Sequence, residues 1–172
     1  LVAFVILLFL YYQIKWTGRV NKEVCHESVI FRATLPSLAG AKEYVPLKCK
    51  TDKICITTGL IGGKCDEFKD AKGVTKVKVK NKEQIEQFLA QEIIDCWSMM
   101  GEGKVSIFSQ WLATTYGVGE VVYPTCVICS RIAFDKTSLE KAGIDLTQVN
   151  IVDYMHRYII SGKDKTYEEY LA

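Results

Sequence analysis

Residues 1–14 read LVAFVILLFLYYQI, a run with no charged residue and a single strongly polar one, Gln13. A helix rises about 1.5 Å per residue, so these 14 residues would cover roughly 21 Å of a hydrocarbon core that is roughly 30 Å thick. The run is therefore too short to cross a bilayer unaided. It lacks the cationic segment and the small-residue cleavage site that flank the apolar core of a secretory signal peptide. We interpret it as the retained end of a membrane anchor.

Aromatic and basic residues end this apolar run, and both types are common at membrane interfaces, where rings and long cationic chains reach the headgroups. They are Tyr11, Tyr12, Lys15, Trp16 and Arg19. The alternative is a buried core helix of a soluble domain, but that alternative does not account for an aromatic and cationic end. We therefore predict a hydrophobic helix over residues 1–18 that lies in a membrane or in a filament core.

The remaining residues, 19–172, suffice for one small domain with a hydrophobic core. The 22 basic and 20 acidic residues of the chain nearly cancel, so no overall charge points to nucleic acid. The chain has no G-x-S-x-G, H-E-x-x-H or phosphate-loop motif. We accordingly expect no catalytic residue, no cofactor, no metal and no small-molecule substrate.

The seven cysteines are many for a chain of this length, and their meaning depends on the compartment. In an oxidising space they would form up to three disulfides and leave one thiol, whereas in the cytosol they would suggest metal binding. They are Cys25, Cys49, Cys55, Cys65, Cys96, Cys126 and Cys129. Basic residues just after an apolar run are typical of the cytoplasmic side, which argues the other way. We nevertheless expect residues 19–172 to form an extracytoplasmic domain.

Residues 44–58, YVPLKCKTDKICITT, alternate apolar and polar residues around a polar centre, which predicts a β-hairpin. A loop over residues 51–53 would place Cys49 opposite Cys55, within reach of a disulfide. Cys65 is the other candidate partner for either cysteine, and the sequence does not choose between them.

Residues 73–80, GVTKVKVK, predict a strand with Val77 and Val79 on one face and three lysines on the other, namely Lys76, Lys78 and Lys80. One interpretation is that these lysines keep an exposed sheet edge from pairing with other chains. The other is that they contact an anionic surface, such as lipid headgroups or a glycan.

The best helix pattern outside the apolar run covers residues 81–100. Asn81 can cap the helix, Gln84 stands where a capping box needs it, and Gly101 would end the run. Apolar residues recur at spacings of three and four: Ile85, Phe88, Leu89, Ile93, Trp97 and Met100. We expect this helix to be the central helix of the domain.

Cys126 and Cys129 form a C-x-x-C motif, but β-branched Val127 and Ile128 separate them and favour a strand. Residues three apart on a strand face opposite sides, so the two thiols should have different partners. We expect Cys96 to bond one of them and Cys25 the other. A zinc site or a thiol-redox pair that faces the cytosol remains the alternative.

The C-terminal third of the chain suggests short helices. Thr137 is the expected cap of a helix that ends at Gly143, and Thr166 of a last one. Between them, a second apolar stripe with helical spacing comprises Leu146, Val149, Val152 and the Met155/His156 pair.

The strings CWSMMGEGK (residues 96–104) and CVICSRIAFD (residues 126–135), with the apolar run and the cysteine pattern, resemble an uncharacterised family of membrane-anchored proteins of DPANN archaea. The resemblance implies a single-pass anchor, and it implies no activity and no functional residue.

Together these patterns predict an α+β fold: a hydrophobic N-terminal helix, then one disulfide-stapled domain of short strands around the central helix. The expected function is that of a non-enzymatic cell-envelope protein in the membrane, used in structural assembly or surface contact. Its expected partners are membrane lipid and either further copies of itself or another envelope protein. The alternative is an extracellular filament subunit similar to type IV pilins, whose N-terminal helix packs in the filament core.

Overall fold

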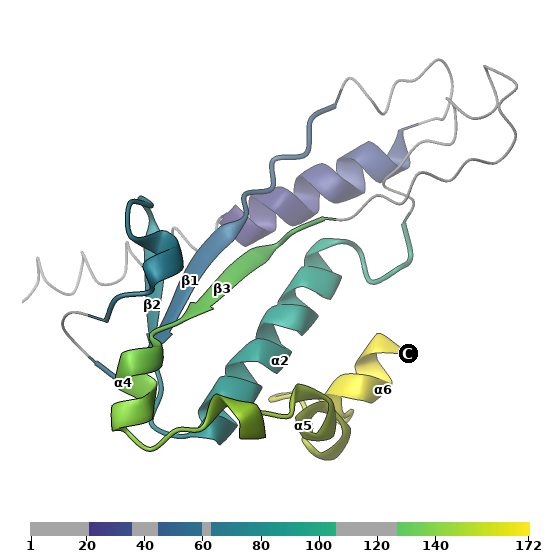
Figure 1. Ribbon diagram of the computed structural model, residues 1–172. Helices are drawn as coiled ribbons and strands as arrows, with labels where there is room; N and C mark the ends of the chain where they lie inside the picture. Colours follow the sequence, from purple (N-terminus) through teal and green to yellow (C-terminus); the bar gives the residue numbers. More distant parts are fainter. Residues whose placement is uncertain (1–20, 36–44, 60–62, 106–126) are drawn as a thin grey trace, which may run out of the picture. The chain divides into compact units, whose positions relative to one another are not determined.

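The computed structural model describes residues 21–35, 45–59, 63–105 and 127–172 (Figure 1). The chain divides into two compact units, one of Leu1–Lys50 with Trp97–Cys126 and one of Thr51–Cys96 with Val127–Ala172. We call them unit 1 and unit 2. The expected helix over residues 1–18 lies outside the described residues, as do all five of its interfacial side chains. Within the described ranges, each helix is too short or too polar to span a bilayer.

Unit 2 contains a sheet of three parallel strands in the order β2-β1-β3 (Figure 1). The strands are β1 (Asp52–Thr57), β2 (Val74–Lys78) and β3 (Ser130–Phe134). The strand expected at residues 73–80 is confirmed, but the hairpin is wrong, because the residues assigned to its loop enter β1. Alternating polarity defines the two faces of a strand, and it does not define the partner or its direction. The unit is a mixed α/β structure.

The expected central helix is confirmed as α2 (Lys82–Met99), whose residues up to Cys96 belong to unit 2. Asn81 Oδ1 accepts the N–H of Gln84 at 3.0 Å, and Gln84 Oε1 accepts the N–H of Lys80 at 2.8 Å. Gly101, with φ of +81°, follows the last turn in the left-handed conformation that ends many helices. The predicted cap and stop are therefore both correct.

The buried side of α2 differs in part from the predicted stripe. Ile93 is 40% exposed, whereas its neighbour Ile94 is buried together with Ala90. Ala90 and Ile94 belong to an apolar cluster that also contains Tyr154 and Tyr167. Spacings of three and four fit either isoleucine, so the position of the packing partner decides which one is buried.

Side chains alternate between the two faces along each strand, and residues in register on neighbouring strands share a face. The two faces of this sheet therefore carry different sets of residues. On the inner face, Ile54 and Ile56 pack against α2 and α4 (Lys136–Lys141) in one apolar cluster. Its buried members are Ile54, Ile56, Val79, Ile85, Leu139 and Ile144. On the outer face, Cys55 and Ala133 pack under a short segment that includes η2 (Asp66–Phe68).

The C-terminal residues of unit 2 form η3 (Leu146–Gln148), α5 (Ile151–Arg157) and α6 (Tyr167–Leu171). The predicted stripe is wrong at Val152, which is 72% exposed, because α5 buries Tyr154 instead.

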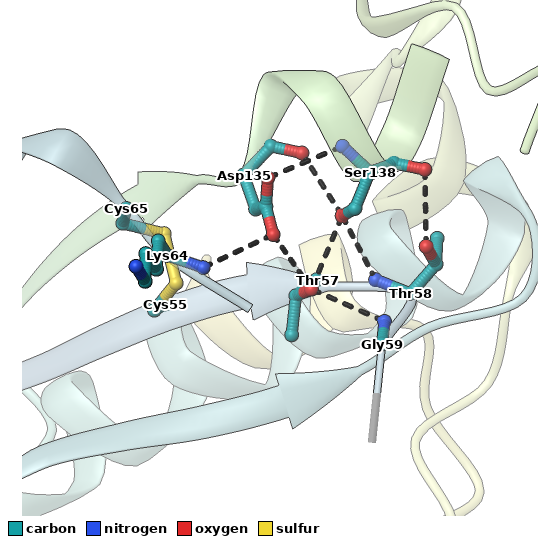
Figure 2. Close-up of a disulfide and its surroundings, with 8 residues drawn as sticks. All are labelled: Cys55, Thr57, Thr58, Gly59, Lys64, Cys65, Asp135 and Ser138. Atoms are coloured by element: carbon teal, nitrogen blue, oxygen red, sulfur yellow. Dashed lines mark hydrogen bonds between the residues drawn. A yellow bond between two sulfur atoms is a disulfide. The ribbon is translucent and has the colours of Figure 1, made fainter. Parts of the chain in front are cut away.

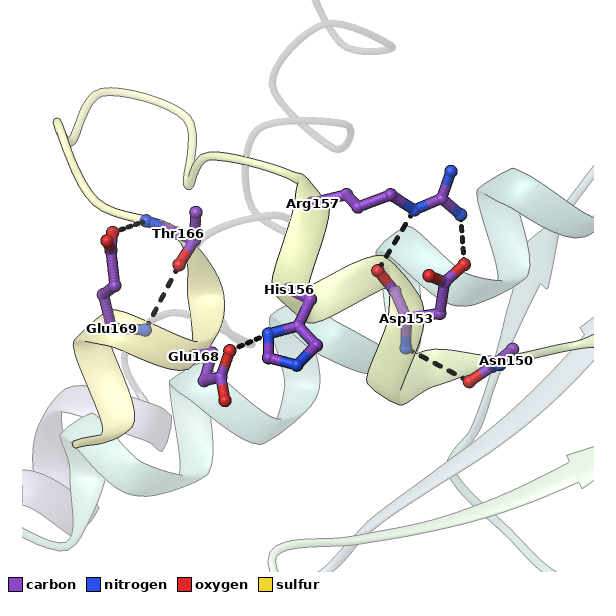
Figure 3. Close-up of polar contacts among 7 residues, drawn as sticks. All are labelled: Asn150, Asp153, His156, Arg157, Thr166, Glu168 and Glu169. Carbon is purple, nitrogen blue, oxygen red and sulfur yellow. Dashed lines mark hydrogen bonds and ion pairs between the residues drawn. The ribbon is translucent and has the colours of Figure 1, made fainter.

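Short-range polar contacts hold these last helices (Figure 3). Thr166 caps α6, as the sequence predicts, and it does so in a capping box with Glu169. A contact between His156 Nδ1 and the Glu168 carboxylate links α5 to α6, and Arg157 forms an ion pair with Asp153 one turn earlier in α5.

In unit 1, residues 21–34 are helical and bury Cys25 and Val29. The buried Ser28 hydroxyl donates to the Cys25 carbonyl at 2.7 Å and accepts the Lys48 N–H at 3.0 Å. Leu47 and Cys49 pack against the same helix. Unit 1 thus has a small apolar core of its own.

Candidate functional site

Three disulfides connect the described residues, Cys25–Cys49 in unit 1 and Cys55–Cys65 and Cys96–Cys129 in unit 2. The expected pair of Cys49 with Cys55 is wrong, whereas Cys65, the alternative partner, does bond Cys55. The prediction that Cys96 bonds one cysteine of the C-x-x-C motif is confirmed. The prediction that Cys25 bonds the other is wrong, because Cys25 is already bonded to Cys49. Cys126 lies outside the described residues.

A polar network lies at the carboxyl end of the sheet, where β1 and β3 end side by side (Figure 2). Thr57, the last residue of β1, is fully buried and donates its hydroxyl to Asp135 Oδ2 at 3.0 Å. Its oxygen also lies 3.1 Å from the Ser138 hydroxyl. Ser138 comes from the first turn of α4, so the network ties the central strand to this helix.

Asp135 is the centre of the network and the true cap of α4, in place of the predicted Thr137. Only 9% of its surface is exposed. Its carboxylate accepts the backbone N–H groups of Ser138 and Lys64, each at 3.1 Å. Burial by itself raises the pKa of this carboxyl, but the hydrogen bonds from Ser138, Thr57 and Lys64 outweigh it, so the pKa lies below its ordinary value of 3.8. Asp135 is therefore a stable anion at neutral pH.

The disulfide between Cys55 and Cys65 helps to place one of these donors. Cys55 lies on β1, and Cys65 follows Lys64 directly in the chain, so the covalent bond fixes the end of the loop beside Asp135 (Figure 2). Both sulfur-bearing residues are buried. The backbone N–H of Lys64 thereby remains directed at the carboxylate.

An open pocket of about 420 Å³ lies above this network. Its lining residues are Lys64, Asp66, Glu67, Phe134, Asp135, Lys136, Thr137, Ser138 and Lys141. Three lysines and two exposed acidic residues, Asp66 and Glu67, are among them, so the lining carries charges of both signs. The Ser138 hydroxyl is already engaged by backbone and side-chain partners. No histidine or cysteine belongs to the residues that line the pocket, so these residues offer Ser138 no imidazole or thiolate base.

The lysines predicted to contact an anionic surface lie on or beside an edge of the described sheet. Lys76 and Lys78 are exposed on β2, and Lys80 is exposed two residues beyond. In the parts of the chain that the structure describes, no group of histidine, cysteine and acidic residues could hold a metal ion. The remaining sequence-predicted site residues, at the membrane interface, lie outside those parts.

Local sequence patterns do not predict the network of Thr57, Asp135 and Ser138. Asp135 and Ser138 have the D-x-x-S spacing of a helix cap, which was a usable signal. The role of Thr57 depends on the parallel pairing of β1 with β3, which local patterns do not reveal.

Comparison with known proteins adds nothing to this geometry, because no protein-family model, curated protein or solved structure matches the chain. The resemblance to an archaeal family stays a prediction.

Proposed function

We propose that this chain is a non-enzymatic cell-envelope protein that is anchored in the membrane through residues 1–18. Its two disulfide-stabilised units act outside the cytoplasm in structural assembly or surface contact. The observation that carries the proposal is the set of three disulfides, which involves six of the seven cysteines. Such bonds persist in oxidising spaces and are rare in the cytosol.

The positions of these disulfides support a structural role. Cys25, Cys55 and Cys65 are each at most 5% exposed, so they are poorly accessible to reductants or substrates. The bonds close loops with sequence separations of 24, 10 and 33 residues. Each closure contributes about 3 kcal/mol to the free energy of unfolding. Small units with limited cores commonly depend on such contributions.

The proposal is tested by counting thiols in native protein. Protein is taken from its own membrane fraction, with thiols blocked during lysis, and its intact mass is measured before and after reduction and a second alkylation. We expect at most one blocking group before reduction, on the one cysteine outside the three pairs, and seven groups afterwards. Six or seven groups before reduction would place both units in a reducing space and overturn the proposal.

The anchor and the orientation need a separate measurement. Intact cells are treated with an amine reagent that cannot cross membranes, and the labelled lysines of units 1 and 2 are identified by mass spectrometry. We expect labelling without lysis, and we expect the protein to stay in the membrane pellet after washing at high pH. Recovery in the fraction that mechanical shear removes from cells would instead support the filament alternative.

A further inference from the structure

The outer face of the sheet carries a cluster of basic residues that only the strand pairing reveals. Lys53 on β1 is in register with Arg131 on β3, so both side chains leave the same face of the sheet. Lys76 and Lys78 on β2 are in register with Cys55 and Thr57, the next two outward positions of β1. We call the four residues Lys53, Lys76, Lys78 and Arg131 the basic face.

Within the described residues, no carboxylate forms an ion pair with the basic face. Lys76, Lys78 and Arg131 are exposed and Lys53 is half-buried, and none of them forms an ion pair there. Arg131 only places its guanidinium over the Phe68 ring, 5.6 Å from the centroid. The segment over the centre of this face, residues 64–72, contains three lysines and three acidic residues, so its own charges cancel.

Protection of a sheet edge explains only part of the basic face. Edge protection accounts for Lys76 and Lys78 on β2, which lies at an edge of the described sheet. Lys53, however, lies on the central strand, where there is no edge to protect. Its Cα is about 4.8 Å from the neighbouring strand that carries Arg131, and like charges directly opposite each other destabilise a sheet. A negatively charged partner would remove this repulsion.

We infer that the basic face binds the headgroups of an anionic lipid bilayer. This inference rests on the proposed function, because the anchor would hold unit 2 near a membrane. A lipid surface fits better than a free polymer, since the same chain supplies an apolar run that ends in Lys15, Trp16 and Arg19. Each basic side chain close to an anionic surface raises the equilibrium constant for binding to that surface about five-fold.

The experiment uses the full chain in lipid nanodiscs made of phosphatidylcholine alone or with a third of it replaced by phosphatidylglycerol. A short pulse of an acetylating reagent modifies free amines, and mass spectrometry measures the rate at each lysine. We expect Lys53, Lys76 and Lys78 to react about five-fold more slowly in the anionic discs. The exposed Lys165 in unit 2 should react equally in both discs. Molar salt should abolish the difference, because it screens charges beyond about 3 Å.

Two variants with the same change in net charge separate the basic face from general electrostatics. K76Q/K78Q should largely remove the protection of Lys53 in anionic discs. The matched control, K163Q/K165Q, changes two exposed lysines before α6 and should leave that protection intact. Equal loss in both variants would mean that only net charge matters and would overturn the inference.

Other outcomes also decide the question. Equal acetylation rates in the two kinds of disc would overturn the inference, and so would equal slowing of Lys165. Protection by added polyphosphate in neutral discs, without protection in anionic discs, would assign the face to an anionic polymer instead. If the chain does not elute with the discs, the proposed anchor is wrong. The basic face is then tested alone, by the same pulse with anionic vesicles added to the protein.

Discussion

On the inner face of the sheet, β1 presents Ile54 and Ile56 to α2, whereas on the outer face the same strand presents Lys53, Cys55 and Thr57. The inner face is covered by large apolar side chains that are almost fully buried. The outer face has smaller buried groups, a disulfide and a hydrogen-bonded network at one end. Burial of apolar side chains is therefore the main stabilising contact on the inner face, whereas a disulfide and hydrogen bonds are the main ones on the outer face.

This difference shows how a small parallel sheet is completed when one layer of helices covers only one face. Parallel strands usually have both faces buried. In unit 2 the short segment around η2 takes the place of a second helix layer, and the Cys55–Cys65 disulfide attaches it to the central strand. Among the described residues, the basic face of Lys53, Lys76, Lys78 and Arg131 occupies the part of that side which this segment leaves exposed.

The largest expected effect is on the inner face. Ile56→Ala removes a fully buried side chain from the main apolar cluster and should lower the free energy of unfolding of unit 2 by about 2–5 kcal/mol. Hydrogen exchange of the β1 and β3 amides measures the change. Val152→Ala, at an exposed apolar position, is the matched control and should cost less than about 0.5 kcal/mol. Equal effects of the two substitutions would contradict the assignment of the inner face.

The next effect concerns the covalent contact of the outer face. Replacement of both Cys55 and Cys65 by alanine opens a loop with a sequence separation of 10 residues and should cost about 2–3 kcal/mol. The same amide exchange reports this loss, with the largest increase expected in the segment around η2. If the β1 amides exchange as slowly as in the parent chain, the disulfide does not stabilise the sheet, and the outer face does not depend on this covalent bond.

A smaller effect is expected at the polar end of the outer face. Asp135→Asn keeps the shape of the side chain, but its amide nitrogen has to face either the Ser138 N–H at the Oδ1 position or the Thr57 hydroxyl and Lys64 N–H at the Oδ2 position, at a cost of about 1–2 kcal/mol. The Asp135 pKa is lower in the folded state than its ordinary value of 3.8, so its contribution is present above that value and is lost as the pH falls through the folded pKa.

The pH dependence of Asp135→Asn separates charge from shape. Unfolding of the parent chain and of this variant is followed as the pH is lowered from neutrality. The difference between them should shrink as the pH falls below the ordinary value of 3.8 and through the lower pKa of Asp135 in the folded state. A difference that stays constant with pH would show that the charge of Asp135 does not matter.

The smallest effect is expected on the basic face. K76Q/K78Q removes two exposed like charges and should change the free energy of unfolding by less than about 0.5 kcal/mol, in either direction. Amide exchange in β2 and β1 measures it. A loss of more than about 1 kcal/mol in the free energy of unfolding would show that these lysines stabilise the fold, and it would contradict a role in binding alone.

Local signals in the sequence identified several elements correctly. Asn81, Gln84 and Gly101 bounded the central helix, and Thr166 began the last one, because capping depends on atoms a few residues apart. The strand with Val77 and Val79 on one face was found because alternation is also local. Asp135 is not predicted as the cap, because Thr137 is the residue with an acidic side chain, Glu140, at the capping-box spacing, and only the backbone path of the chain selects Asp135.

The sequence by itself determined that a central helix and short strands form, since propensity, alternation and capping act within a few residues. It predicted disulfides but left a zinc or thiol-redox site as the alternative. Only the tertiary structure decided that the strands run parallel, that Cys55 bonds Cys65 and Cys25 bonds Cys49, and that Thr57 meets Asp135. It also brought Lys53 beside Arg131. These contacts join residues far apart in the chain, and their selection depends on how the apolar faces of all elements are buried together.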